Sequence, residues 1–351
     1  MNFATPLDAD AIKQIRHSLW RRTRNVCLAL ALILLAAFAL AMVLGDYPVP
    51  LPDLARALLS PLTGIRDPGI DFIVLNVRLP RAILAVLAGA AFALAGSLFQ
   101  TVLRNPLASP DIIGISQGAS AAAVFCIIVL GWTGASLALG AFAGALLTAA
   151  AIYALAWRDG ISPYRVVLVG IAMAAILSAV IAYLFTRARL ADVQQALFWL
   201  VGSLGAAGTS QLVPLALALV VLVPLAMLAS HGLSALQLGD DTARALGSRV
   251  ELTRLGLLLT AVALAAFATA AVGPVAFVAF VAGPITRQLV GTSSAGLLPV
   301  MLVGAITMLG ADLIAQHALP ATQLPVGVVT GLFGALFLIW LLISANRAGR
   351  L

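Results

Sequence analysis

Long apolar runs alternate with short polar segments along this chain of 351 residues. A helix that crosses the hydrocarbon core of a membrane needs roughly 20 mostly apolar residues. The pattern predicts about ten such helices, near residues 25–45, 80–102, 112–130, 135–157, 164–186, 210–229, 252–271, 275–290, 297–316 and 326–344. The eighth is short and interrupted by glycine and proline. We therefore expect an all-α polytopic membrane protein with a single transmembrane domain over residues 1–351.

The composition supports this expectation. Hydrophobic residues make up 62% of the chain and charged residues only 9%, whereas soluble domains carry roughly 25% charged residues. The net charge of +7 could indicate nucleic-acid binding, but the arginines stand at the ends of apolar runs, where they set topology. Cys27 and Cys126 lie inside apolar runs, and the three histidines are far apart. We expect no disulfide, metal site or bound cofactor.

The basic residues indicate which ends of the helices face the cytoplasm. Residues 1–24 hold five of the 20 basic residues and are expected to form a cytoplasmic tail. With that tail inside, fourteen basic residues fall on the inner side and both termini are cytoplasmic. The other six fall on the outer side: Arg56, Arg66, Arg78, Arg81, Arg187 and Arg189. They are candidates for contact with an acidic partner or an anionic ligand, and a snorkelling position at the lipid interface explains them equally well.

Two of the predicted outer segments are long. The first, residues 45–79, is rich in proline and aspartate, and we expect a short helix at Asp53–Leu59. The second, residues 186–208, contains an amphipathic stretch, Ala191–Leu204, that should lie on the outer surface.

The charged segment His231–Arg254 is the most polar part of the predicted inner side. It contains six charged residues: Asp240, Asp241, Arg244, Arg249, Glu251 and Arg254. Asp240 or Asp241 can cap a short helix, and Gly247 can end it. A docking surface for a soluble partner needs such a segment, and so does a solvated loop that sets topology. The residues alone leave both interpretations open.

Two motifs bear on catalysis. Lys13 is the only lysine, and the phosphate-binding loop of an ATPase requires a lysine within G-x-x-x-x-G-K-[ST]. This chain is therefore not itself an ATPase. Gly114–Gly118 matches the G-x-S-x-G pattern of hydrolases, but it opens a membrane helix and lacks a suitably placed histidine. We instead predict that four polar residues line the bundle interior or a pathway: Gln100, Ser116, Gln117 and Ser120.

Asp312 is the only carboxylate well inside a predicted span. Placing an ionised carboxylate at the centre of a bilayer costs at least about 3 kcal/mol. One interpretation is a proton or substrate relay, which would suit an ion-coupled secondary transporter. The other is a structural residue near the outer end of its helix that accepts hydrogen bonds from backbone N–H groups of a neighbouring loop.

A weak internal similarity links the second and seventh spans. The stretch that begins at Arg81 is echoed by the stretch that begins at Arg254, and a proline-bearing loop follows each span. Because the two spans are five apart, they should cross the membrane in opposite directions. An inverted-repeat transporter would show this arrangement.

Several motifs, in order along the chain, resemble those of the permeases of bacterial ABC importers for iron chelates and vitamin B12. They are Arg78–Arg81 (RLPR), Ala88–Gly96, Arg104–Gly114 (RNPLASPDIIG), Gly239–Gly247 (GDDTARALG), Gly273–Phe277 (GPVAF) and Gln323–Gly331. The amino-acid sequence of Gly239–Gly247 is most similar to that of the permeases for ferric-enterobactin-type siderophores. One position departs from the family pattern, because Ile285 stands where the family usually has histidine.

The resemblance implies a ten-helix, inverted-repeat permease of a type II ABC importer in the bacterial cytoplasmic membrane. Its cargo would be an iron(III)–siderophore complex delivered to the outer arginines by an extracytoplasmic binding protein. It would pair with a second permease, either a homologous chain or another copy of itself. ATP and magnesium would be bound by a separate ATPase dimer that docks on the cytoplasmic helices of residues 231–250. The implied coupling residues are Leu238, Gly239, Asp240, Asp241, Ala243, Arg244, Ala245, Leu246 and Gly247.

Overall fold

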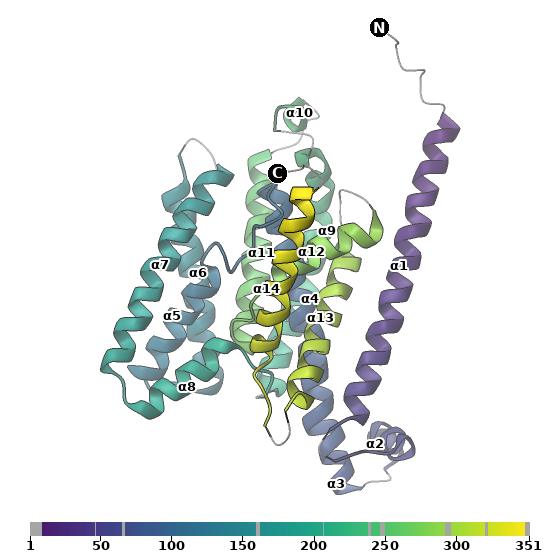
Figure 1. The fold of residues 1–351 in the computed structure, drawn as a ribbon, viewed down its shortest axis with the longest axis vertical. Helices are drawn as coiled ribbons and strands as arrows, with labels where there is room; N and C mark the ends of the chain where they lie inside the picture. The colour runs from purple at the N-terminus through teal and green to yellow at the C-terminus, as the bar shows by residue number, and fades with distance from the viewer. Residues whose placement is uncertain are drawn as a thin grey trace.

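The computed structural model describes residues 9–45, 47–64, 67–158, 162–205, 207–237, 240–245, 250–291, 296–319 and 322–347. Every regular element in these ranges is helical (Figure 1). The elements are α1 (Ala9–Val43), α2 (Leu51–Thr63), α3 (Pro68–Asp71), the π-helix η1 (Phe72–Arg78), α4 (Leu79–Val102), α5 (Ile115–Ile128), α6 (Gly134–Ala156), α7 (Pro163–Arg187), α8 (Leu190–Val201), α9 (Thr209–Gln237), α10 (Asp240–Ala245), α11 (Val250–Val272), α12 (Val278–Val290), α13 (Leu297–His317) and α14 (Val326–Arg347).

The ten predicted spans all correspond to helices, but two are shorter than predicted. Within the described residues, eight helices are long and apolar enough to cross a membrane. The remaining two, α5 and α12, have 14 and 13 residues. The span predicted at 112–130 was too long because a turn occupies residues 103–114. Gly114 ends that turn in the left-handed conformation, with φ 90°, and α5 begins only at the next residue.

The predicted surface elements lie at the two ends of the bundle. The short helix expected at Asp53–Leu59 is α2, and the amphipathic stretch forms α8. Figure 1 shows α2, α3 and α8 at one end, and α10 at the other. Helix α1 begins at Ala9, so much of the predicted N-terminal tail continues the first spanning helix.

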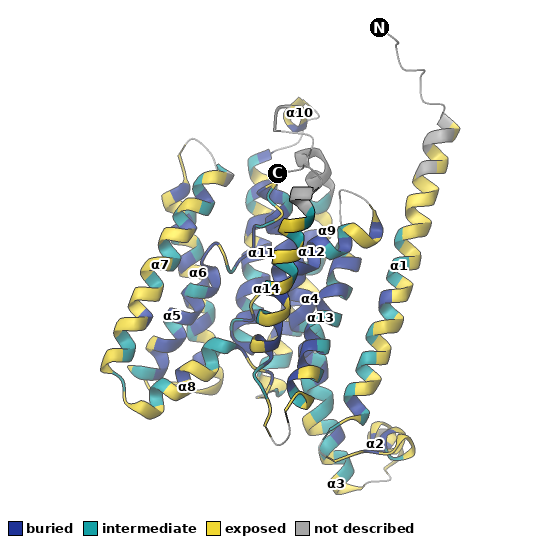
Figure 2. Cartoon of the chain, in the orientation of Figure 1, coloured by how far each residue is buried: buried dark blue, intermediate teal, exposed yellow. Residues whose placement is uncertain are grey.

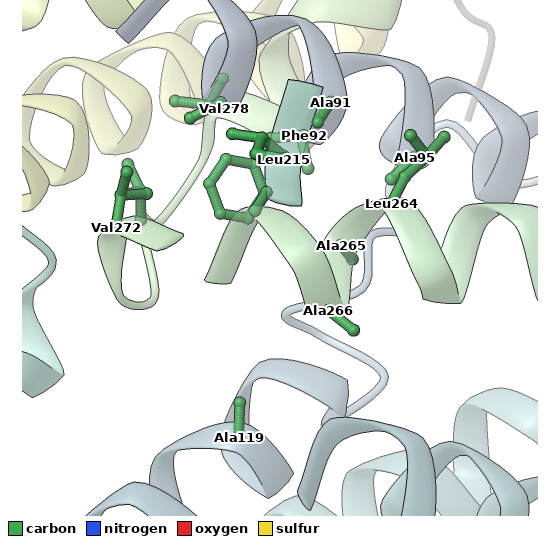
Figure 3. Packing of buried hydrophobic residues seen from close by; sticks show 14 of the residues in the cluster. Ala91, Phe92, Ala95, Ala119, Leu215, Leu264, Ala265, Ala266, Val272 and Val278 are labelled. Carbon is green, nitrogen blue, oxygen red and sulfur yellow. The ribbon is translucent and has the colours of Figure 1, made fainter. Parts of the chain in front are cut away.

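Helix α4 forms the centre of the bundle. It packs against α13, α11, α12 and α9, and residues 88–100 of α4 are all buried. Figure 3 shows Phe92 of α4 close to Leu215 of α9 and Val278 of α12. Helices α4 and α11 are in contact, and they start at opposite ends of the bundle (Figure 1). The predicted opposite direction of these two spans is therefore confirmed.

Exposed apolar side chains cover the outside of the bundle. Only 11% of the most apolar window of α1 is buried, and only 17% of that of α7. Figure 2 shows extensive exposed surface along both helices. A soluble protein rarely exposes apolar patches of this extent, so these faces fit contact with lipid or with another membrane chain.

Glycine allows the central helices to approach closely. A Cβ atom on Gly96 of α4 would overlap the carbonyl oxygen of Ala279 in α12. We expect Gly96→Ala to lower the free energy of unfolding by about 1–3 kcal/mol, because one of the two backbones must move. The matched control is Gly256→Ala in α11, where a Cβ atom would meet no atom within 4 Å. Thermal unfolding in detergent micelles measures both variants, and equal midpoints would contradict the prediction.

Candidate functional site

A cavity lined by both polar and apolar side chains lies between α5, α7, α8 and the segment that precedes α12. Its volume is about 390 Å³, and its described lining consists of Asp111, Ser116, Gln117, Ser120, Ser178, Ile181, Leu200, Pro274 and Ala276. Three of the four predicted pathway residues, Ser116, Gln117 and Ser120, therefore share one cavity. They do so because they occupy the first two turns of α5, which begins directly after the turn at Gly114.

Hydrogen bonds connect most of the polar side chains in this cavity. The Ser116 hydroxyl donates to Oδ1 of Asp111, and the Gln117 amide donates to the Ser178 hydroxyl over 2.7 Å. The Ser120 hydroxyl donates to the backbone carbonyl of Ser116 over 2.8 Å. The second carboxylate oxygen of Asp111, Oδ2, is buried and has no hydrogen-bond partner among the described residues. Because Oδ2 is itself buried, it does not open onto the cavity.

Gln100 lies in a different polar cluster, between α4 and α12. Its side chain is buried, donates to the carbonyl oxygen of Phe280 over 2.9 Å and accepts from Arg287 over 3.0 Å. A Cβ atom on Gly283 would overlap the Gln100 amide oxygen, so glycine makes room for this contact. The sequence grouped Gln100 with the α5 residues, but its contacts join two packed helices and it does not line the α5 cavity.

Ile285, at the position of the usual family histidine, lies in an apolar environment. It packs against a small buried cluster formed by Leu30, Ala93, Val300 and other hydrophobic residues. The side chain therefore contributes to packing between helices, as an aliphatic residue is expected to.

Asp312 and Arg81 form an ion pair near the end of the bundle that holds α2. The Arg81 guanidinium contacts both carboxylate oxygens, with Nη2 at 2.9 Å from Oδ1 and Nε at 3.1 Å from Oδ2. Gln316 donates to Oδ2 over 2.7 Å, and Arg81 also donates to Gln323 over 3.1 Å. The Asp312 side chain is only 2% exposed. The structural interpretation of Asp312 is supported, but its predicted partners were wrong, since side chains bind it instead of backbone N–H groups.

Four of the other arginines predicted on the outer side have contacts within the described part of the chain. Arg78 donates to the carbonyl oxygens of Met42, Val43 and Tyr47 and so binds the C-terminal end of α1. Arg56 pairs with Asp53 on α2, and Arg189, the residue before α8, pairs with Asp192 in the first turn of α8; both guanidinium groups are exposed. The Arg187 guanidinium stacks over the ring of Tyr183, and Arg66 lies outside the described residues. Docking of a partner therefore stays a prediction, and the partly buried Arg78 and Arg81 are poorly placed for it.

The described part of the charged segment comprises the end of α9, the short helix α10 and the start of α11, and α10 packs against both of these helices. In Figure 1 it projects from the end of the bundle opposite α2. Ala243 is buried, whereas Arg244 and Ala245 are exposed. Asp240 and Asp241 begin the helix. The predicted coupling residues Leu238, Gly239, Leu246 and Gly247 lie outside the described residues.

Three residues of these two clusters were not among the predicted site residues. Asp111, Ser178 and Arg287 were not assigned to a site from the sequence. Only the folded chain brings Ser178 of α7 to α5 and Arg287 of α12 to α4. No group of three or more His, Cys, Asp or Glu side chains that could hold a metal ion occurs in the described part of the chain.

Comparison with known proteins gives a consistent result. The model of the FecCD transport family matches residues 33–344. The chain is 39% identical to the ferric enterobactin transport system permease protein FepG of Escherichia coli (strain K12), over 82% of this chain and 87% of that protein. It is 37% identical to the Fe(3+)-citrate import system permease protein YfmE of Bacillus subtilis (strain 168), over 92% and 96%. A solved inward-facing conformation of a metal-chelate type ABC transporter is similar in fold, with a TM-score of 0.79, 26% identity and coverage of 92% and 99%.

Proposed function

This chain belongs to the FecCD transport family, and we propose that it is the permease of an ATP-driven importer that carries an iron(III)–siderophore complex into the cytoplasm. The observation that carries the proposal is the family match, which spans nearly all the membrane helices. Two similar proteins are named for transport of ferric enterobactin and of iron(III) citrate. These names agree on an iron(III) chelate and differ in the chelator.

In this proposal the energy comes from a separate ATPase dimer, because the chain has no phosphate-binding loop. The ATPases contact residues 231–250, within which α10 projects from the end of the bundle. Helix α10 packs against α9 and α11, and both of these pack against the central α4. When ATP binding moves the ATPases, the displacement of α10 is therefore transmitted through α9 and α11 to the central α4. This movement alters access to the pathway.

The remaining partners follow from the same proposal. A second permease, either a homologous chain or another copy, completes the pathway, and an extracytoplasmic binding protein delivers the chelate at the end that holds α2 and α8. The exposed arginines Arg56, Arg187 and Arg189 at this end suit an acidic partner surface. The protein would lie in the bacterial cytoplasmic membrane, with both termini in the cytoplasm, in agreement with the distribution of basic residues.

Transport in proteoliposomes tests the function. The permease, its ATPase and its binding protein are reconstituted together, and accumulation of iron-55 chelate is measured with ATP supplied on the ATPase side. We expect accumulation that requires ATP and is insensitive to a proton ionophore. The control replaces the lysine of the ATPase phosphate-binding loop and should abolish uptake. Uptake by the permease alone, driven by a proton gradient, would contradict the proposal and favour a secondary transporter.

A further inference from the structure

The cavity beside α5 contains polar side chains, but its described lining carries no positive charge. It presents three serine hydroxyls, one glutamine amide and the Asp111 carboxyl group, together with apolar side chains from α7 and α8. None of the described residues that line it is lysine or arginine. The start of α5 contributes a partial positive charge of about half a unit. Asp111, four residues before that helix, already offsets it.

This lining discriminates strongly between iron(III) chelates of different charge. A chelate that leaves water must exchange its hydration for groups on the protein, and a buried polyanion requires cations or many donors to replace that hydration. An ionised Asp111 repels an anion at short range in a low-dielectric environment. A protonated Asp111 supplies one donor but still no cation. In both protonation states the cavity disfavours an anion of high charge.

The charge of an iron(III) chelate depends on its chelating groups, and two classes of chelate differ in this respect. Three hydroxamate groups, each a monoanion, balance the charge of iron(III), so the complex is neutral. Three catecholate groups, each a dianion, leave a trianionic complex. Peptide-based hydroxamate chelators also carry carbonyl oxygens, which can accept hydrogen bonds from the Gln117 amide and the Ser178 hydroxyl, neither of which is buried.

We propose, on the basis of the function proposed above, that this cavity is a chelate subsite selective for neutral or cationic complexes of the hydroxamate class. Gln117 and Ser178 bind the periphery of the chelate, whereas Asp111 acts on it through charge alone. Trianionic complexes of the catecholate class are excluded by the absence of a counter-charge. Ser178 lies on the exposed side of the cavity, on α7, and is the position where a new charge would alter selectivity with the least disturbance of packing.

Equilibrium binding to the full-length permease in lipid nanodiscs tests the subsite without a binding protein. The probes are gallium(III) complexes, which keep the charge of the iron complexes but are not redox-active: a neutral peptide trihydroxamate and a trianionic tricatecholate. We expect saturable binding of the neutral complex, at least about tenfold tighter than that of the trianionic complex. Ser178→Arg should change the ratio of the two affinities by about tenfold or more in favour of the trianion.

The matched control is Ser210→Arg, which adds the same charge at an exposed position of α9 outside the cavity lining and should leave the ratio unchanged. Three results would overturn the subsite: tighter or equal binding of the trianion, an unchanged ratio in Ser178→Arg, or no saturable binding of either complex. The transport assay distinguishes failure of the subsite proposal from failure of the proposed permease function. ATP-driven import of a trianionic chelate would refute the charge selectivity while supporting the permease function.

Discussion

Asp312→Asn is expected to lower the free energy of unfolding by about 3 kcal/mol or more. The Asp312 side chain is 2% exposed and that of Arg81 is 14% exposed, so little water is available to replace the lost ion pair. Asparagine keeps the shape of the side chain but removes the charge that the guanidinium contacts through two nitrogens. The cost arises because Arg81 is left partly buried without its counter-charge. Thermal unfolding of the purified permease in detergent micelles measures the change.

Two further variants show whether burial of the pair causes the effect. Asp192→Asn removes the acid of the Arg189 pair, in which the arginine side chain is 85% exposed, and should cost less than about 1 kcal/mol. The double variant Arg81→Met, Asp312→Leu replaces the whole pair by apolar side chains and should recover most of the lost stability. If the two Asp→Asn variants lose equal stability, burial is not the cause.

The same variants separate the two interpretations of Asp312. In the structural interpretation, the double variant folds and still transports in the reconstituted importer. A relay of protons or substrate would instead require the carboxylate itself, and transport would be lost in a double variant that is fully folded. The ion pair favours the first outcome, because a carboxylate held by Arg81 and Gln316 has its hydrogen-bonding oxygens occupied.

The sequence predicted the helices well because apolar runs of spanning length depend only on local composition. It predicted the ion pair poorly, since Arg81 and Asp312 are separated by 231 positions. Both were assigned to the outer side, but nothing in the pattern indicated that α4 and α13 are neighbours. Arg81 was therefore assigned to a docking surface, and Asp312 to backbone donors, when each is the partner of the other.

The lengths of α5 and α12 illustrate a second limit. The segments that precede them, Pro110–Gly114 and Gly273–Phe277, are largely apolar, so hydropathy alone cannot separate them from the helices. Glycine and proline indicated an interruption of the predicted span at 275–290, but they did not show how many residues precede α12. The separation of Gln100 from the α5 residues has the same origin, because the turn at residues 103–114 directs α5 toward α7 while α4 stays against α12.

Replacing Ala245 and Leu246 together with aspartate is expected to release the ATPase from the permease and reduce ATP-driven uptake to background. Ala245 ends α10 on its exposed side. Small and apolar side chains at a protein contact exclude water, and two new carboxylates would have to lose their hydration there. They would also add to the negative charge of Asp240 and Asp241. Co-purification of the ATPase with the tagged permease measures docking directly.

The design must distinguish a lost contact from a misfolded permease. Ser210→Asp with Gln211→Asp adds the same two charges to the first turn of α9, at the opposite end of the bundle, where helix polarity favours acids. This control should retain both the ATPase and uptake. Ala243→Asp serves as the opposite reference, since Ala243 is buried and an aspartate there should disrupt the packing of α10 itself.

If α10 is the docking site of the ATPase, the unfolding temperature and the ATPase recovery should change differently in the two variants. The Ala245, Leu246 variant should unfold at the wild-type temperature yet lose the ATPase, whereas Ala243→Asp should lose the ATPase with a lower unfolding temperature. If the Ala245, Leu246 variant recovers as much ATPase as the wild type, the ATPase binds elsewhere on the permease. Helix α10 would then be a solvated connection between α9 and α11. If the variant recovers the ATPase but its uptake falls to background, these residues transmit the movement instead of holding the ATPase. The ATPase would then stay bound without changing the arrangement of the helices.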